Sequence, residues 1–138
     1  MTEIELAWLA GILEGEGSFF LENNRSGGKL YRYAIVTVNM TDKDVIDRVS
    51  ALFGTTTYAI PNTKAGKKPA YRATLKSHKA VVLMEHLLPF MGERRSAKIL
   101  EVLTAFKAIE PTEIRRANSC SESQKKRWAL HGTREGKL

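Results

Sequence analysis

The sequence is poor in the residues that build disulfides, metal centres and membrane spans. Cys120 is the single cysteine among 138 residues, which excludes an internal disulfide and a cysteine-built zinc site. No apolar run approaches the roughly 18 residues that a membrane-spanning helix needs. Glutamates, and no lysine or arginine, precede the first apolar run, which argues against a secretory signal. We therefore expect an intracellular protein with no membrane partner.

Histidine is also scarce. The three histidines, His78, His86 and His131, are scattered along the chain, and no metal-ligand spacing links them. We expect them to be surface or packing residues and not parts of a site.

The remaining composition is that of an ordinary globular protein. With 43% apolar and 27% charged residues, the chain can bury the core of one domain. We place this core domain at residues 1–111. Residues 112–138 form a polar and basic C-terminal extension, for which we expect a short helix around 123–130 and a frayed end.

The net charge of +7 is unevenly distributed. Residues 1–23 carry five glutamates and no lysine or arginine, whereas residues 24–79 carry eleven lysines and arginines against three aspartates. The extension from 112 to 138 carries seven basic and three acidic residues. A basic middle and a basic end favour a polyanionic partner, because neutralising phosphates releases condensed counterions.

Hydrophobic periodicity and turn residues predict a series of helices and strands. They are a helix at 4–14, strands at 19–22 and 30–40, a helix that has Thr41 as its N-cap and runs to Leu52 or Phe53 before Gly54, strands at 55–60 and 70–76, and helices at 77–88 and 93–109. Segments 23–28 (NNRSGG) and 61–69 have the composition of hairpin loops. Adjacent antiparallel strands interleaved with helices indicate an α+β protein.

The end of the first helix carries a distinctive stretch, since residues 9–17 read LAGILEGEG. This stretch resembles the nine-residue signature of the LAGLIDADG homing endonucleases, with the Leu-Ala-Gly start, both acids and the final glycine in place. Glutamate replaces aspartate at both acids, Glu14 and Glu16, and Gly15 stands between them, a variant known in the family. The element order, the helix end ALFG and the segment LLPF…RRSAKILEVL follow the family pattern too, so the resemblance covers roughly residues 5–110.

The resemblance implies an αββαββα fold whose saddle-shaped antiparallel sheet lies in the major groove of DNA. It also implies that two motif helices pack at a central axis. Members with one motif are homodimers, and this chain has one. Independently, Ala7, Gly11 and Gly15 recur every four residues and share a helix face, where small side chains let two backbones approach closely. The alternative is that these glycines accommodate a neighbouring strand of the same chain.

Phosphodiester hydrolysis needs an activated water and charge relief on the phosphate, which divalent metals held by carboxylates supply. By position in the motif, the resemblance makes Glu16 the metal-binding acid, the Gly15 carbonyl a second ligand and Mg2+ the cofactor. Glu14 matches an acid that is usually less directly involved. The alternative for Glu16 is a solvated carboxylate, although an acid at a helix C-terminus opposes the helix dipole.

The family usually adds a basic and a polar residue near the attacking water. A lysine common near this place is absent, so Arg94 or Arg95 would act there electrostatically, since arginine is a poor proton acceptor. A salt bridge or a phosphate clamp is the alternative role. Asn39 is the polar candidate.

DNA contacts should fall on alternate strand residues and on the basic loops. The candidates are Glu22, Asn24, Arg25, Lys29, Tyr31, Tyr33, Tyr58, Lys64, Lys67, Lys68 and Arg72. In the extension, Lys125, Lys126 and Arg127 could reach flanking phosphates, and Trp128 is expected to anchor that segment. The strand register decides which face meets DNA.

These inferences predict an intron-encoded, homodimeric and Mg2+-dependent DNA endonuclease. It would make a staggered double-strand cut at a long pseudo-palindromic site. One alternative is a non-catalytic DNA-binding regulator or an intron-splicing RNA cofactor (maturase) on the same scaffold, with RNA the less favoured partner. A second alternative is a protein-interaction domain in which the glycine helix is only a dimer seam.

Overall fold

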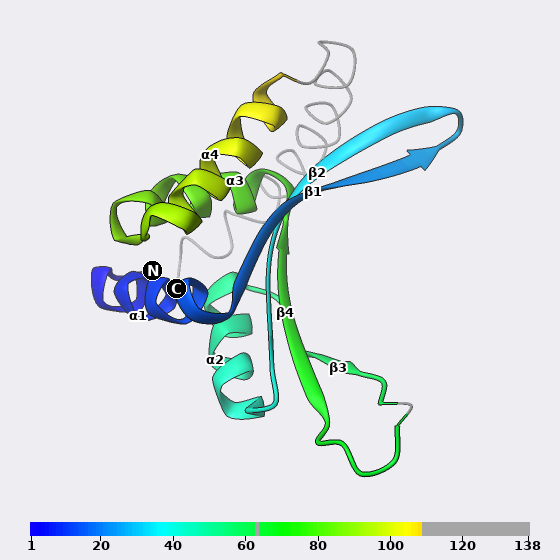
Figure 1. Cartoon of the computed structure of the whole chain (residues 1–138), viewed down its shortest axis with the longest axis vertical. Coiled ribbons are helices and arrows are strands. Elements are labelled where there is room, and N and C mark those ends of the chain that lie inside the picture. Colours follow the sequence, from blue (N-terminus) through cyan, green and yellow to red (C-terminus); the bar gives the residue numbers. More distant parts are fainter. Residues whose placement is uncertain (63, 109–138) are drawn as a thin grey trace, which may run out of the picture.

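The computed structural model describes residues 1–62 and 64–108, and these residues form an antiparallel sheet covered by helices on one face (Figure 1). The predicted extension, residues 112–138, lies outside the described residues, together with Cys120, Lys125, Lys126, Arg127, Trp128 and His131. The elements are α1 (Glu3–Glu16), β1 (Gly17–Ser26), β2 (Lys29–Met40), α2 (Lys43–Phe53), β3 (Tyr58–Ile60), β4 (Ala70–Lys76), α3 (Ser77–Leu87), the 3-10 turn η1 (Leu88–Phe90) and α4 (Glu93–Lys107). This order confirms the predicted α+β class.

Helix α1 begins with a capping box. The hydroxyl of Thr2 accepts from the backbone N–H of Glu5 at 3.1 Å, and the Glu5 carboxylate accepts from the Thr2 N–H at 2.8 Å. These two bonds satisfy donors that the first turn would otherwise leave unpaired. Leu9, Ala10 and Leu13 are buried against the rest of the chain. The opposite side of α1 is exposed, so among residues 1–62 and 64–108 the helix packs on one side only.

The first hairpin differs from the prediction. Strand β1 continues through Asn23–Ser26, which we predicted to be loop, and Ser26 pairs directly with Lys29. The turn consists of Gly27 and Gly28 alone, with φ values of 58° and 76°. Two adjacent residues with positive φ match the twist of a two-residue hairpin turn. The hairpin is therefore longer than predicted and projects well beyond the helices (Figure 1).

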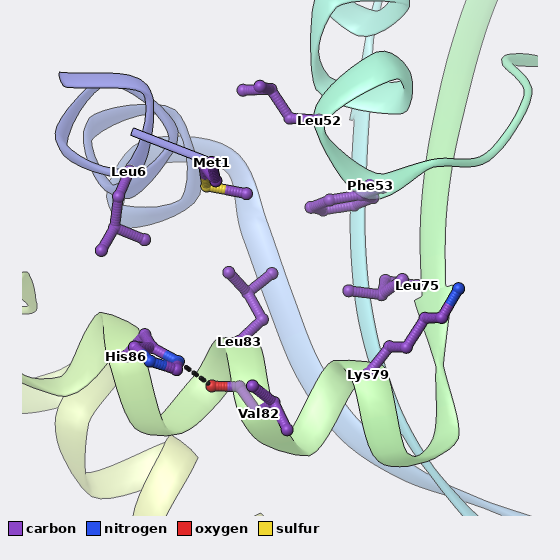
Figure 2. A pocket seen from close by; sticks show the side chains of 9 residues that line it. All are labelled: Met1, Leu6, Leu52, Phe53, Leu75, Lys79, Val82, Leu83 and His86. Carbon is purple, nitrogen blue, oxygen red and sulfur yellow. Dashed lines mark hydrogen bonds between the residues drawn. The ribbon is translucent and has the colours of Figure 1, made fainter. Parts of the chain in front are cut away.

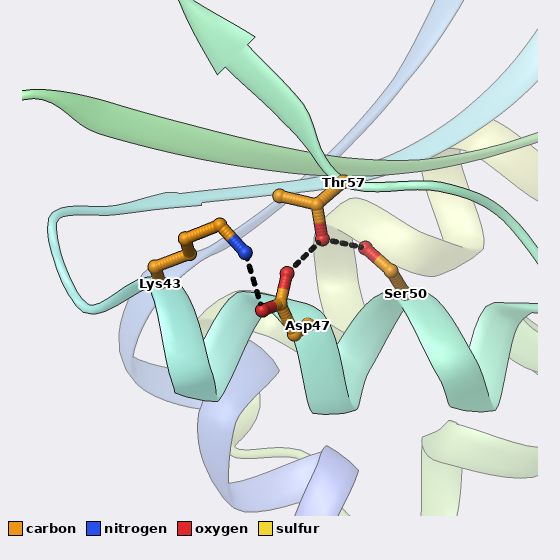
Figure 3. A network of polar contacts seen from close by, with 4 residues as sticks. All are labelled: Lys43, Asp47, Ser50 and Thr57. Carbon is orange, nitrogen blue, oxygen red and sulfur yellow. Dashed lines mark hydrogen bonds and ion pairs between the residues drawn. The ribbon is translucent and has the colours of Figure 1, made fainter.

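The sheet order is β1-β2-β4-β3, with every neighbouring pair antiparallel. Strand β3 begins at Tyr58 and not at Thr55 as predicted. Thr57, just before it, bonds to α2: its hydroxyl donates to Asp47 Oδ1 at 2.6 Å and lies 3.0 Å from Ser50 Oγ (Figure 3). Lys43 Nζ completes this network, 2.7 Å from Asp47 Oδ2. The segment leading to β3 is thus tied to a helix and not to a strand.

This network shifts the pKa of both charged members. The hydrogen bond from Lys43, reinforced by the one from Thr57, lowers the pKa of Asp47 below its usual 3.8. The hydrogen bond to Asp47 raises the pKa of Lys43 above its usual 10.5. Both shifts favour the charged forms at neutral pH.

The ends of α2 show one correct and one incorrect prediction. The N-cap is Asp42 and not Thr41, and neither a side-chain bond nor a capping box fixes it. The C-terminal end at Phe53 is as predicted, because Gly54 takes the left-handed conformation with φ 70°. Glycine favours that conformation because it has no Cβ.

The core lies between the sheet and the helices. Its fully buried side chains include Leu9 and Leu13 from α1, Val36 from β2, Ile46 from α2 and Ile99 from α4. Because successive side chains of a strand point to opposite faces of the sheet, every second strand residue points away from the helices. The helices do not cover this second face, which we call the uncovered face (Figure 1). Over residues 1–62 and 64–108, every helix is too short or too polar to cross a bilayer.

Candidate active site and DNA-binding face

Glu16 is the last residue of α1, and β1 starts immediately after it. Its side chain is exposed, and it makes neither a hydrogen bond nor an ion pair with any residue that the structure describes. Gly17 pairs with Val38 at the start of the β1–β2 ladder. Glu16 is thus an unengaged carboxylate at the junction between a helix end and the sheet.

The predicted polar residue, Asn39, lies next to that junction. Glu16 directly precedes Gly17 and Asn39 directly follows Val38, so both lie just beyond the Gly17–Val38 pair that begins the β1–β2 ladder. The Asn39 side-chain oxygen accepts from Arg72 Nε at 2.8 Å. Asn39 is therefore already oriented by a basic neighbour on β4.

Arg95 contacts the same helix end from α4. Its Nε donates to the main-chain oxygen of Glu14 at 3.0 Å, and Nη2 donates to that of Gly15 at 3.3 Å. Nη1 donates to the main-chain oxygen of Gly17. The adjacent Arg94 is exposed and forms no such bonds with the described part of the chain. The two arginines that we predicted as alternatives are therefore in different environments.

Glu14 differs from Glu16 in having a partner. One of its carboxylate oxygens accepts from the backbone N–H of Gly92 at 3.1 Å. Gly92 is the N-cap of α4 and offers no side chain of its own for capping. The Glu14 carboxylate takes the part that an N3 glutamate has in a capping box, because it accepts from the N–H of the N-cap residue, and it lies at the positive end of the α4 dipole.

The face of α1 with Ala7, Gly11 and Gly15 is exposed in the single chain. A Cβ atom added at Gly11 or Gly15 would meet no atom within 4 Å. Within the described part of the chain these two glycines therefore do not accommodate a strand, which argues against that alternative. Ile4 continues the same face one turn earlier and is 80% exposed.

The side chains at the end of α1 fit a magnesium ion better than a metal that needs a complete protein cage. Over residues 1–62 and 64–108, no group of three or more His, Cys, Asp or Glu side chains could hold a metal. Mg2+ typically keeps several waters and takes one or two carboxylates plus substrate phosphates, so an exposed carboxylate such as that of Glu16 suits it. The Gly15 carbonyl has a second lone pair free, but the Arg95 guanidinium beside it would repel a cation there. The Glu16 carboxylate is therefore a better metal ligand than the Gly15 carbonyl oxygen.

The register places most of the predicted DNA contacts on the uncovered face of the sheet. Side chains alternate between faces, and Ala34, Val36 and Val38 of β2 point into the core. The predicted residues that share the uncovered face are Glu22, Asn24, Lys29, Tyr31, Tyr33, Tyr58 and Arg72. Arg25 alternates with Asn24 and so points to the opposite face.

Sequence reasoning left out several residues of that face. The register adds Ser18, Phe20, Thr37, Thr74 and Lys76. Thr37 and Thr74 lie opposite each other, with hydroxyl oxygens 3.1 Å apart, and Lys76 forms an ion pair with Glu22 at 3.3 Å. Alternation along a strand could have identified them, because Ser18 and Phe20 share a face with the predicted Glu22 and Asn24.

The loop between β3 and β4 presents three lysines, Lys64, Lys67 and Lys68, all exposed. Asn62 organises the loop from its base. Its side-chain nitrogen donates to the main-chain oxygen of Lys67 at 2.9 Å, and its side-chain oxygen accepts from the Lys64 N–H at 3.1 Å. The loop and the β1–β2 hairpin tip project from the same side of the molecule, away from the helices (Figure 1). A polyanion along the uncovered face would meet both.

A separate cavity of about 360 Å3 lies on the helical side, between α1, α2 and α3 (Figure 2). Its lining is mostly apolar, and His86 at its edge bonds to the main-chain oxygen of Val82 in its own helix, with 2.7 Å between the two atoms. None of the predicted site residues lines it.

No family model matches the sequence, and no curated protein does. Solved structures do match. The homing endonuclease I-CvuI in complex with the I-CreI target aligns with a TM-score of 0.61 at 17% identity, over 80% of this chain and 71% of that chain. The group I intron-encoded homing endonuclease I-CeuI, complexed with DNA, aligns with 0.51 at 20% identity, over 77% and 56%.

A third structure, the LAGLIDADG meganuclease I-AabMI bound to uncleaved DNA, aligns with a TM-score of 0.56 at 13% identity, over 85% of this chain and 41% of that chain. At such identities the likeness shows the fold. The chain has the α+β fold of the LAGLIDADG homing endonucleases, which confirms the predicted resemblance and fold class.

Proposed function

We propose that this chain is a site-specific DNA endonuclease that works as a homodimer and hydrolyses phosphodiester bonds at a long pseudo-palindromic site. The observation that carries the proposal is the unengaged Glu16 carboxylate at the end of a helix whose small-residue face is uncovered. Neighbours of this fold are described as homing endonucleases in complex with DNA, one of them in the presence of 2 mM Mg.

The dimer rests on the exposed face of α1. A second copy packed there would bury Ile4 and would use the space that Gly11 and Gly15 leave open. A two-fold axis along this face places the two Glu16 residues on either side of it. The 41% coverage of I-AabMI also supports this arrangement, because it is close to the share that one of two similar halves would have.

DNA would lie along the uncovered sheet face. The β1–β2 hairpin with Lys29 and the loop with Lys64, Lys67 and Lys68 would contact phosphates, and the strand residues between them would face base edges. Two copies related by a two-fold axis read the same sequence twice in opposite directions. The expected target is therefore long and pseudo-palindromic.

In the proposed reaction a water oxygen forms the new bond to phosphorus, and the ester oxygen leaves with a proton. Mg2+, when bound, would relieve charge on the phosphate and lower the pKa of water. Glu16 would bind this cation. Arg94, which is exposed and directly precedes Arg95 on α4, would add positive charge toward the phosphate, and Asn39, held by Arg72, would donate or accept a hydrogen bond with the water.

Cleavage of a plasmid library of randomised targets with Mg2+ tests the proposal, with Glu16→Gln as the matched control. We expect linear product at a small set of sites for the natural chain and none for Glu16→Gln. Both proteins should bind the selected target with similar affinity. Glu16→Gln replaces one carboxylate oxygen with an NH2 group and keeps the size of the side chain. A loss of cleavage would therefore report on the negative charge of the carboxylate.

Two other outcomes of these assays would favour a different function. Salt-sensitive DNA or RNA binding without cleavage would indicate a regulator or a maturase on the same scaffold. Absence of salt-sensitive nucleic-acid binding would indicate a protein-interaction domain.

A further inference from the structure

We propose that Arg95 is a positioning residue: its guanidinium holds the last turn of α1 so that Glu16 is presented in one orientation. Glu14 is its counterpart, a capping residue for α4 and not a metal ligand. The inference deepens the proposed nuclease function and rests on it for its catalytic consequence. Its structural part is independent of that function.

The end of α1 lacks its usual sources of stabilisation. A helix leaves its last four carbonyl oxygens without intrahelical partners, and the last turn of α1 has no basic residue. The C-cap Gly17 is extended, with φ −75° and ψ 152°, and so does not form the left-handed cap that often satisfies these groups. A single bond from its N–H to the Leu13 oxygen remains at the cap.

Arg95 supplies the missing donors. Its three nitrogens reach the main-chain oxygens of Glu14, Gly15 and Gly17, so the carbonyls on both sides of Glu16 are held by one rigid group. Its positive charge also lies at the negative end of the α1 dipole. The side chain is half-buried at this junction, which restricts its own movement.

Glu14 completes a reciprocal arrangement. Its carboxylate accepts from the N–H of Gly92, at the start of the helix that carries Arg95. Each helix therefore contributes to the capping of the other: Arg95 of α4 binds carbonyl oxygens at the end of α1, and Glu14 of α1 binds the N–H of the N-cap residue of α4. A Cβ at position 92 would lie 3.0 Å from a Glu14 carboxylate oxygen, so the absence of a side chain at Gly92 makes this close contact possible.

Fixing this junction matters because glycines flank Glu16 on both sides. Glycine has the most backbone freedom of any residue, whereas a metal-binding carboxylate must be held to within about 0.5 Å. A guanidinium fork can hold several acceptors in fixed geometry, but a lysine ammonium is a point charge on a flexible stem. Arg95→Lys therefore keeps the charge and removes the clamp.

The experiment compares Arg95→Lys with Arg48→Lys in the full-length protein. Arg48 also contacts α1, because its guanidinium stacks on the Trp8 ring at 3.8 Å, but this contact is far from the helix end. Hydrogen exchange by mass spectrometry over peptides that include 13–18 reports on the clamp without any metal or DNA. We expect faster exchange there, by about 10-fold, for Arg95→Lys, and unchanged exchange for Arg48→Lys.

The same variants are assayed for cleavage and for DNA affinity. For Arg95→Lys we expect the single-turnover cleavage rate to fall about 10²-fold, half-saturation to need more Mg2+, and the DNA dissociation constant to stay within about threefold of the natural value. Arg48→Lys should keep both the rate and the affinity. A purely electrostatic Arg95 would instead be replaced by lysine with little loss of rate.

Three results would overturn the inference: natural exchange in Arg95→Lys, faster exchange without slower cleavage, or slower cleavage with natural exchange. If Arg95→Lys does not fold, Glu14→Ala, which removes the acceptor, tests the other half of the junction, with faster exchange of the Gly92 amide expected and natural exchange there contradicting the clamp. If the natural protein cleaves no DNA, the nuclease proposal fails, but the exchange data still decide whether the clamp exists.

Discussion

The backbone of Gly17 passes so close to Leu13 that a Cβ atom there would lie 2.6 Å from the Leu13 main-chain oxygen. The same added atom would lie 2.9 Å from both the Cα and Cδ2 atoms of Leu13. Leu13 is fully buried, so it cannot move aside without disturbing the core. The final glycine of the LAGILEGEG stretch is thus required by the turn from helix to strand.

Gly17→Ala should therefore destabilise the protein by about 1–3 kcal/mol, because it overpacks the junction. Chemical denaturation at several protein concentrations measures this effect. Gly11→Ala is the control, since its new methyl group meets no atom of the described residues within 4 Å and alanine is a better helix former by up to about 1 kcal/mol. Equal stability of the two variants would show that the junction relaxes freely.

Gly11→Leu should disrupt the proposed dimer while it leaves the single chain folded. A leucine at this exposed position would hold two α1 helices apart, whereas Ala51→Leu adds the same side chain at an exposed position of α2. We expect Gly11→Leu to sediment as a monomer with a natural circular dichroism spectrum. A dimer that survives Gly11→Leu and not Ala51→Leu would place the interface on α2.

Much of the fold could be predicted because its signals are local. The α1 motif, the alternation in β2 and the left-handed glycine after α2 each depend on neighbouring residues, and the structure agrees with all three. The errors arose where one local signal overrode another. Asn23–Ser26 reads as a loop, but the Gly27-Gly28 turn needs no further residues and leaves them to pair in β1.

The Arg95 contacts are of another kind. Arg95 is separated from Gly15 by 80 positions, and no periodic pattern links them. Sequence reasoning could name Arg94 and Arg95 together, but only their positions on α4 distinguish an exposed arginine from one that bonds to α1. Likewise, the exposure of Gly11 and Gly15 required the packing of the whole chain.

The two basic residues at the first hairpin tip should differ in their contribution to DNA binding. Lys29 lies on the uncovered face and Arg25 on the opposite one. Lys29→Ala should weaken binding and reduce the slope of log affinity against log salt by about 1, and Arg25→Ala should change that slope less. Fluorescence anisotropy with labelled duplex DNA over a salt series provides the measurement. Equal slopes for both variants would contradict the assignment of faces.

The Lys43–Asp47–Thr57 network predicts a specific dependence of stability on acid. The pKa of Asp47 is lower in the folded chain than its usual 3.8, so the folded state favours the ionised form. The resulting stabilisation is present above the usual pKa and is lost as the pH falls through the folded-state value. Asp47→Asn should therefore lower the urea midpoint at neutral pH and show a flatter decline on acidification below about pH 4. Asp44 is an exposed acid in the same helix, and Asp44→Asn should keep the decline of the natural protein. If the stability of Asp47→Asn fell with pH in parallel to that of the natural protein, the network would not stabilise the fold.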